Sequence, residues 1–145
     1  MLCLPPEHIK LIENRDWGST VRGPVWVHAS KGMTKRDYED ACDFAVGVGV
    51  PHSLLPPMAS LPRGGIVGHF TITDLILPGG KHIGKRGARR EDLQPHPRAG
   101  DRWYMGGFGY VTEGNRPVPF VPCKGALGFW RVPDEVVRTL TGVDH

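Results

Sequence analysis

The longest candidate strand of this sequence reads GGIVGHFTITDLIL and runs from Gly64 to Leu77. Two glycines open the run, and the turn-forming stretch Pro78-Gly79-Gly80 ends it. Alternate residues of a strand point to opposite faces, so apolar and polar side chains separate here: Ile66, Phe70 and Ile72 on one face, His69, Thr71 and Thr73 on the other. The pattern predicts a strand with one buried face, around which a sheet is built.

Shorter runs of β-branched and aromatic residues lie on both sides of this strand. They predict strands at residues 9–17, 25–29, 118–123 and 127–132, and two short strands within 103–112 broken at Gly106-Gly107. A turn is expected at Asn115-Arg116-Pro117, and the prolines at 119 and 122 indicate that the strand after it lies at a sheet edge.

Two helices are predicted. Apolar residues recur at helical spacing from Tyr38 to Val46, and Thr34 with Asp37 resembles a capping box in front of them. A closing helix at 134–140 follows Pro133 and ends at Gly142. About five to seven short strands, two helices and many Gly and Pro turns predict a β-rich α+β fold, a small partly open β-barrel with one or two flanking helices.

Size and composition favour one domain over residues 1–145, with a basic loop inserted at 78–101. No apolar run approaches the roughly 18 residues that span a bilayer, so no membrane partner is expected. The N-terminus lacks the features of a secretory signal. Three cysteines without CxxC spacing suit a reducing compartment, so we expect a cytoplasmic protein.

Residues 10–17, KLIENRDW, place several charged and polar side chains on a predicted strand. On an ideal strand Glu13, Arg15 and Trp17 share a face, while Lys10 points away unless the chain bends or bulges near Leu11. Taken alone, the spacing is equally that of a surface ion pair worth at most about 1 kcal/mol.

The segment resembles the GxKxxExRxW signature of ASCH domains, with His8 in place of the first glycine. Three later blocks are similar to family blocks in the same order: residues 22–31 to RGPxxIHASK, 61–68 to LPRGAIVG, and 119–130 to PxPCxGxLGLW. The four blocks cover most of the chain.

This resemblance implies a PUA-like β-barrel that binds RNA or a nucleotide in a cleft beside the barrel. The residues that it assigns to the ligand are Lys10, Glu13, Arg15, Ser30 and Lys31, with Trp17 or Trp26 as walls. Lysine and arginine side chains contact phosphates, a carboxylate accepts from a base amino group, and tryptophan stacks on bases.

The resemblance also leaves an enzyme open, a metal-independent hydrolase of RNA (a ribonuclease) or of a modified nucleoside, with Lys10 and Glu13 as its catalytic residues. Bacterial N4-acetylcytidine amidohydrolases carry a related GxKxxTxR motif, but Glu13 stands where their threonine nucleophile is expected. We therefore expect binding ahead of that reaction. An adaptor that binds a protein is a third alternative.

No metal or cofactor is expected, because the seven histidines form no HxxxH pair and no CxxC accompanies them. The chain has a formal charge of +3, and five basic residues with no acidic one fall between 81 and 90: Lys81, Lys85, Arg86, Arg89 and Arg90. Such a run is either an arm that contacts a nucleic-acid backbone or a solvated loop. Residues 79–100 lack apolar periodicity and exceed an ordinary loop, so we expect them to pack poorly and contribute little stability.

Overall fold

The structure is a computed structural model, and it describes residues 4–83 and 93–142. Its elements, in chain order, are the 3-10 turn Pro6–His8, strands β1 (Ile12–Arg15) and β2 (Gly23–Ala29), helix α1 (Lys35–Gly47), the 3-10 turns His52–Leu54 and Met58–Ser60, strands β3 (Gly65–Ile76), β4 (Lys81–Ile83), β5 (Leu93–Pro95) and β6 (Phe108–Pro122), and helix α2 (Asp134–Thr141). Within the described ranges, no helix has both the length and the apolar composition needed to cross a membrane.

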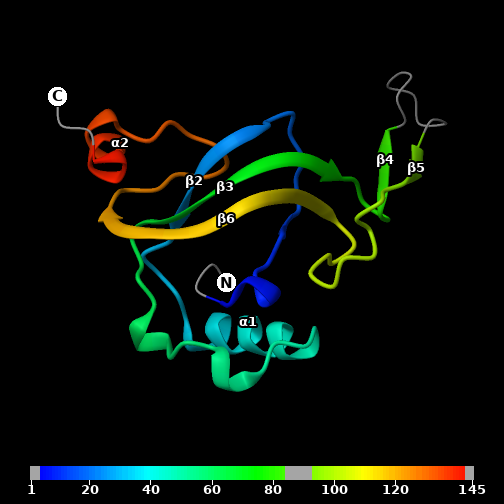
Figure 1. Ribbon diagram of the computed structural model, residues 1–145, viewed down its shortest axis with the longest axis horizontal. Helices are drawn as coiled ribbons and strands as arrows, with labels where there is room; N and C mark the ends of the chain where they lie inside the picture. Colours follow the sequence, from blue (N-terminus) through cyan, green and yellow to red (C-terminus); the bar gives the residue numbers. More distant parts are fainter. Residues whose placement is uncertain (1–3, 84–92, 143–145) are drawn as a thin grey trace. The chain divides into compact units, whose positions relative to one another are not determined.

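The strands form a four-stranded sheet in the order β1-β6-β3-β2 and a separate hairpin of β4 and β5. Strands β2, β3 and β6 lie side by side in Figure 1, as this order requires. Strand β1 pairs antiparallel with the first part of β6, from Ile12 opposite Val111 to Arg15 opposite Phe108. The β-rich α+β prediction is confirmed, and among the described strands the sheet is open, with β1 and β2 as its edges.

Contacts divide the chain into two compact units, and β3 and β6 contribute residues to both. The first unit comprises Met1–Ile9, Val25–Phe70 and Arg116–His145, and its buried apolar side chains include Ala45, Val50, Ile66 and Val136. The second comprises Lys10–Pro24 and Thr71–Asn115, and it buries Ile12, Ile72, Ile76, Trp103 and Tyr110. Each unit therefore has apolar burial of its own.

Helix α1 confirms the helix and the capping box predicted from the sequence. The Asp37 N–H donates to Thr34 Oγ1 at 3.0 Å, and the Thr34 N–H donates to Asp37 Oδ2 at 3.1 Å. The bond from the Thr34 backbone, followed by that with its side chain, lowers the pKa of Asp37. Helix α2 is confirmed as well, and Gly142 ends it in the left-handed conformation, with φ 68°.

Strand β6 corrects the prediction of separate short strands around a turn at 115–117. It continues from Phe108 to Pro122 through the expected turn, and a positive φ of 64° at Gly114 absorbs the irregularity. Pairing with β1 covers only residues 108–111 of β6. Among the described strands, none pairs with its proline-rich second half on that side, where a missing N–H costs no ladder bond.

Two other predictions of strands are wrong. Residues 127–132 are irregular, because Leu127 is fully exposed and Gly128 turns the chain with φ 71°. Trp103 and Tyr104 lie in a turn ahead of β6, where Trp103 is buried.

The ends of the basic insertion are ordered, contrary to the expectation of a poorly packed loop. Strands β4 and β5 pair antiparallel, with Lys81 opposite Pro95 and Ile83 opposite Leu93. His96, directly after β5, is only 5% exposed. Four of the basic residues singled out in the sequence, Lys85, Arg86, Arg89 and Arg90, lie outside the described residues.

Candidate functional site

The three signature side chains of the second unit meet at one carboxylate. Arg15 Nη1 lies 2.7 Å from Glu13 Oε1, and Lys10 Nζ lies 4.0 Å from Glu13 Oε2. The Arg15 side chain is 49% exposed, that of Glu13 30% and that of Lys10 23%. This Lys10–Glu13–Arg15 triad is therefore held together while remaining accessible to a ligand.

Lys10 reaches Glu13 because the chain before β1 is clamped to an irregular part of β6. Thr112 donates from its N–H to Leu11 O at 2.9 Å and from Oγ1 to the same oxygen at 3.0 Å. Asn115 Nδ2 donates to Lys10 O at 3.1 Å and to Thr112 Oγ1 at 2.9 Å. Lys10 and Leu11 lie ahead of β1, which begins at Ile12, and Gly114 of β6 has a positive φ of 64°.

Trp17 lies on the same side of the unit as the triad, next to Tyr110. Tyr110 stands directly opposite Glu13 in the β1–β6 register, and its ring meets that of Trp17 edge to face, with centroids 5.7 Å apart. The Tyr110 hydroxyl donates to Trp17 O at 3.3 Å. On the opposite face of β1, Asn14 Nδ2 donates to Trp103 O at 2.8 Å, which anchors the strand to the core.

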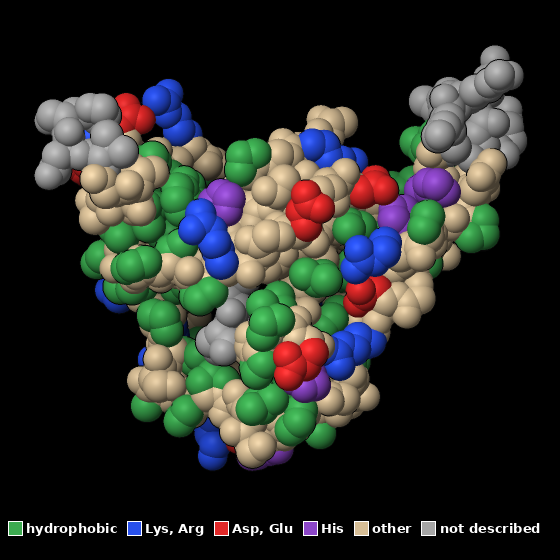
Figure 2. All heavy atoms as spheres, in the orientation of Figure 1, with side chains coloured by type: hydrophobic (Ala, Val, Ile, Leu, Met, Phe, Trp, Pro, Cys, Tyr) green, Lys and Arg blue, Asp and Glu red, His purple; other side chains and the backbone are tan. Residues whose placement is uncertain are grey.

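Charged side chains of both signs are interspersed on the face of the molecule shown in Figure 2, with no single-sign patch among the atoms coloured there. The excess charge of +3 is thus not gathered on that face.

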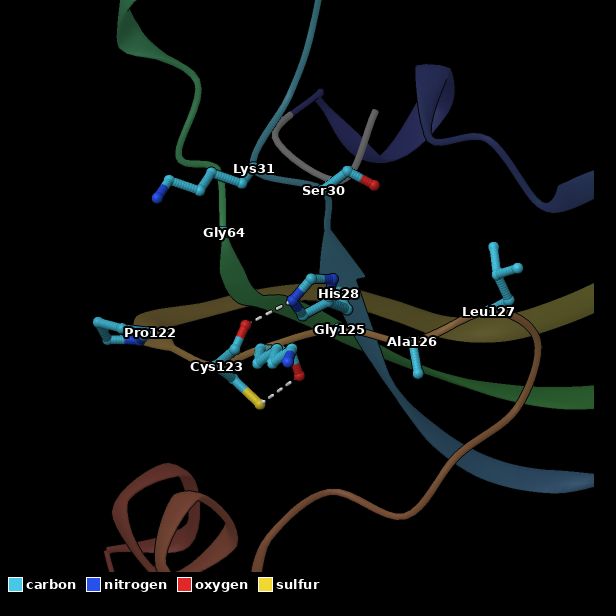
Figure 3. A pocket seen from close by; sticks show the side chains of 10 residues that line it. His28, Ser30, Lys31, Gly64, Pro122, Cys123, Gly125, Ala126 and Leu127 are labelled. Carbon is cyan, nitrogen blue, oxygen red and sulfur yellow. Dashed lines mark hydrogen bonds between the residues drawn. The ribbon is translucent and has the colours of Figure 1, made fainter.

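A pocket of about 790 Å³ lies in the first unit, and Figure 3 shows it from close by. It is formed by the end of β2, the start of β3 and the chain after β6, through His28, Ser30, Lys31, Gly64, Pro122, Cys123, Lys124, Gly125, Ala126 and Leu127. Three of the four sequence blocks that resemble ASCH domains thus contribute to one hollow. Its lining, as far as the structure describes it, contains two lysines and no carboxylate.

Close backbone approaches shape this pocket. The Gly64 N–H donates to Ala29 O at 2.8 Å, and the Cys123 N–H donates to Gly64 O at 3.1 Å. His28 Nε2 lies 2.7 Å from Cys123 O, and a Cβ on Gly125 would stand 2.5 Å from the His28 ring. Gly125 is therefore needed for the chain to pass over the imidazole.

The residues assigned to the ligand by the resemblance fall into both units. Lys10, Glu13, Arg15 and Trp17 belong to the second unit, whereas Ser30 and Lys31 line the pocket of the first. That Ser30 and Lys31 share a ligand with the triad stays a prediction. Trp26 also belongs to the first unit, where its ring meets that of His69 edge to face at 4.9 Å. Lys81 is exposed at the start of β4.

Sequence reasoning missed several groups that support these places. For the triad they are Tyr110, Thr112 and Asn115, which nothing in the local pattern marks as neighbours of Lys10. For the pocket they are His28, Gly64 and residues 122–127, and the similarity of residues 119–130 to a family block was the available signal.

A polar pair in the second unit, between buried His96 and partly exposed Asp74, was also missed. His96 Nε2 lies 2.7 Å from Asp74 Oδ2, and the Arg98 N–H donates to His96 Nδ1 at 2.9 Å. Since Nδ1 accepts, the ring proton sits on Nε2 and is donated to Asp74. Both ring nitrogens are therefore committed within the protein.

No protein-family model matches this sequence, and no curated protein matches it either. Over the residues that the structure describes, no three His, Cys, Asp or Glu side chains gather as metal ligands would. The triad and the pocket are therefore the candidate sites within the described residues.

Proposed function

We propose that this chain is a cytoplasmic ASCH domain with a PUA-like, partly open barrel, and that it binds RNA or a nucleotide through Lys10, Glu13 and Arg15. One observation carries the proposal: a lysine and an arginine converge on one carboxylate while all three side chains remain partly exposed.

This arrangement can exchange partners at low cost. Ion pairs at accessible positions contribute at most about 1 kcal/mol. Little free energy is therefore lost when a phosphate replaces Glu13 as the partner of Arg15. The guanidinium matches phosphate with two parallel donors, and the released Glu13 carboxylate accepts from a base amino group. Trp17, partly exposed next to Tyr110, offers an indole ring for stacking.

Titration of labelled single-stranded RNA, followed by fluorescence anisotropy at several salt concentrations, tests this proposal. Lys10→Ala with Arg15→Ala should weaken binding at least about tenfold and flatten the slope of log K against log[salt] by about 1.4, two phosphate contacts at about 0.7 each. The matched control is Lys35→Ala with Arg131→Ala, which removes the same charges from exposed ion pairs with Glu39 and Asp134. Equal losses in both double variants would contradict a site at the triad.

The same incubation separates binding from hydrolysis. We expect intact RNA after incubation in EDTA, and no deacetylation of N4-acetylcytidine, because Glu13 replaces the hydroxyl nucleophile of that reaction. Metal-independent cleavage products that disappear in Glu13→Gln would instead establish the ribonuclease alternative, with Lys10 and Glu13 as catalytic residues.

The proposal includes the basic insertion, whose lysines and arginines would contact the phosphates of a bound RNA. Neutralising Lys81, Lys85, Arg86, Arg89 and Arg90 together should reduce the salt slope by about 2–3, corresponding to three or four phosphate contacts. An unchanged slope would show that these charges are only solvated.

A further inference from the structure

The pocket of the first unit has the electrostatics of an anion site. Lys31 and Lys124 line it, together with the hydroxyl-bearing Ser30, and its described lining holds no acidic side chain to neutralise them. Lysine binds phosphate as a compact point charge. We infer that this pocket binds a small phosphate monoester, independently of RNA binding at the triad.

Three backbone N–H groups of the pocket-lining segment are not used within the described protein. Within the described chain, the N–H groups of Gly125, Ala126 and Leu127 donate to no protein acceptor, and all three residues line the pocket. Successive unpaired amides are a common way for proteins to bind phosphate oxygens. The segment that carries Lys124 therefore offers neutral donors next to a positive charge.

One part of the pocket wall is held in place by His28. The imidazole of His28 holds Cys123 O with Nε2, and Gly125 lies against its ring. The Trp130 ring meets His28 edge to face, with centroids 5.5 Å apart. His28 is thus a positioning residue for the amide-bearing segment.

The size and lining of the pocket indicate an organic phosphate. A volume of about 790 Å³ lies in the range of small-molecule sites and far exceeds that of a single ion. Figure 3 shows the side chains of Ser30 and Lys31 pointing in opposite directions, so the polar groups are spread along the hollow. Pro122, Ala126 and Leu127 add an apolar wall, and Leu127 is fully exposed.

Isothermal titration calorimetry with four probes tests the inference: inorganic phosphate, ribose 5-phosphate, adenosine 5′-monophosphate and adenosine. We expect saturable binding of the two esters, tighter than that of inorganic phosphate, and none of adenosine. Lys31→Ala with Lys124→Ala should weaken ester binding at least about tenfold. Lys35→Ala with Arg131→Ala, which removes two exposed charges outside the pocket, should leave it unchanged.

Three results would overturn the inference: no binding of either ester at millimolar concentration, binding of adenosine equal to that of its monophosphate, or equal affinity in the pocket variant and the control. Lys10→Ala with Arg15→Ala separates the two sites. Ester binding that survives in this variant while RNA binding is lost supports both proposals, and ester binding that it abolishes assigns the phosphate to the triad and overturns the pocket. Thermal melting of each variant checks that the fold is retained.

Discussion

Two polar clusters of the second unit have the same pairing distance and different surroundings. Arg15 and Glu13 approach to 2.7 Å, and so do His96 and Asp74. Arg15 and Glu13 are 49% and 30% exposed, whereas His96 is 2% exposed although its partner Asp74 is 51% exposed. Pairing distance therefore does not separate a candidate ligand site from a structural contact, whereas the solvent access of the nitrogen-bearing side chain does.

The His96 cluster continues into the chain ahead of β6. Arg98 Nη2 lies 2.8 Å from Asp101 Oδ2, and Asp101 Oδ1 accepts from the Trp103 N–H at 2.8 Å. The His96 N–H itself donates to Gly80 O at 2.7 Å. These bonds tie the β4–β5 hairpin to the buried part of the unit, so the cluster stabilises structure.

The largest effect is expected from His96→Ala. Removing this buried ring leaves the Arg98 N–H without its acceptor and opens a cavity, so the free energy of unfolding should fall by about 2 kcal/mol or more. Urea unfolding of the variant beside His52→Ala, an exposed histidine, measures it. A loss below about 0.5 kcal/mol in His96→Ala would show that the cluster is not structural.

The clamp behind the triad should give an intermediate effect. Thr112→Val removes a buried hydroxyl that donates to Leu11 O and accepts from Asn115, and should cost about 1 kcal/mol. Because Lys10 depends on this clamp for its position, RNA affinity should fall as well. Unchanged affinity in a destabilised variant would separate the clamp from the triad.

Acid should weaken the Asp74 contact selectively. Burial raises the pKa of Asp74, but hydrogen bonds from the Leu75 N–H and His96 outweigh it and leave the pKa below 3.8. A lowered pKa means that the unfolded chain takes up the proton first, so the stabilisation is present above about pH 4 and is lost as pH falls through the folded pKa. Melting temperatures of Asp74→Asn and the wild type should therefore converge as the pH falls below about 4, and a difference that stays constant there would contradict this.

The smallest stability effect is expected at the triad. Lys10→Ala and Arg15→Ala should each change the free energy of unfolding by about 0.5 kcal/mol, because both side chains remain partly solvated. Thermal melting beside the RNA titration measures both properties in one preparation. If either variant melted far below the wild type, the triad would have to be grouped with the His96 cluster.

The sequence alone determined the elements whose signals are local. The capping box of Thr34 and Asp37 and the helical spacing from Tyr38 to Val46 were correctly interpreted, because nearby residues supply their stabilising contacts. The strand at β3 was also found, although its burial alternates only in part, since Leu75 and Ile76 are both buried. Glu13 and Arg15 were placed on one face for the same reason, since a strand fixes the relation of residues two apart.

Only the tertiary structure decided the contacts between distant residues. Lys10 is held near Glu13 by the hydrogen bond from Asn115 to its carbonyl oxygen, and the His96 ring is bonded to Asp74. The pocket depends on His28 meeting Cys123, 95 positions along the chain. Composition and periodicity carry no record of such pairings, because packing and hydrogen bonding between separate segments select them when the chain closes on itself.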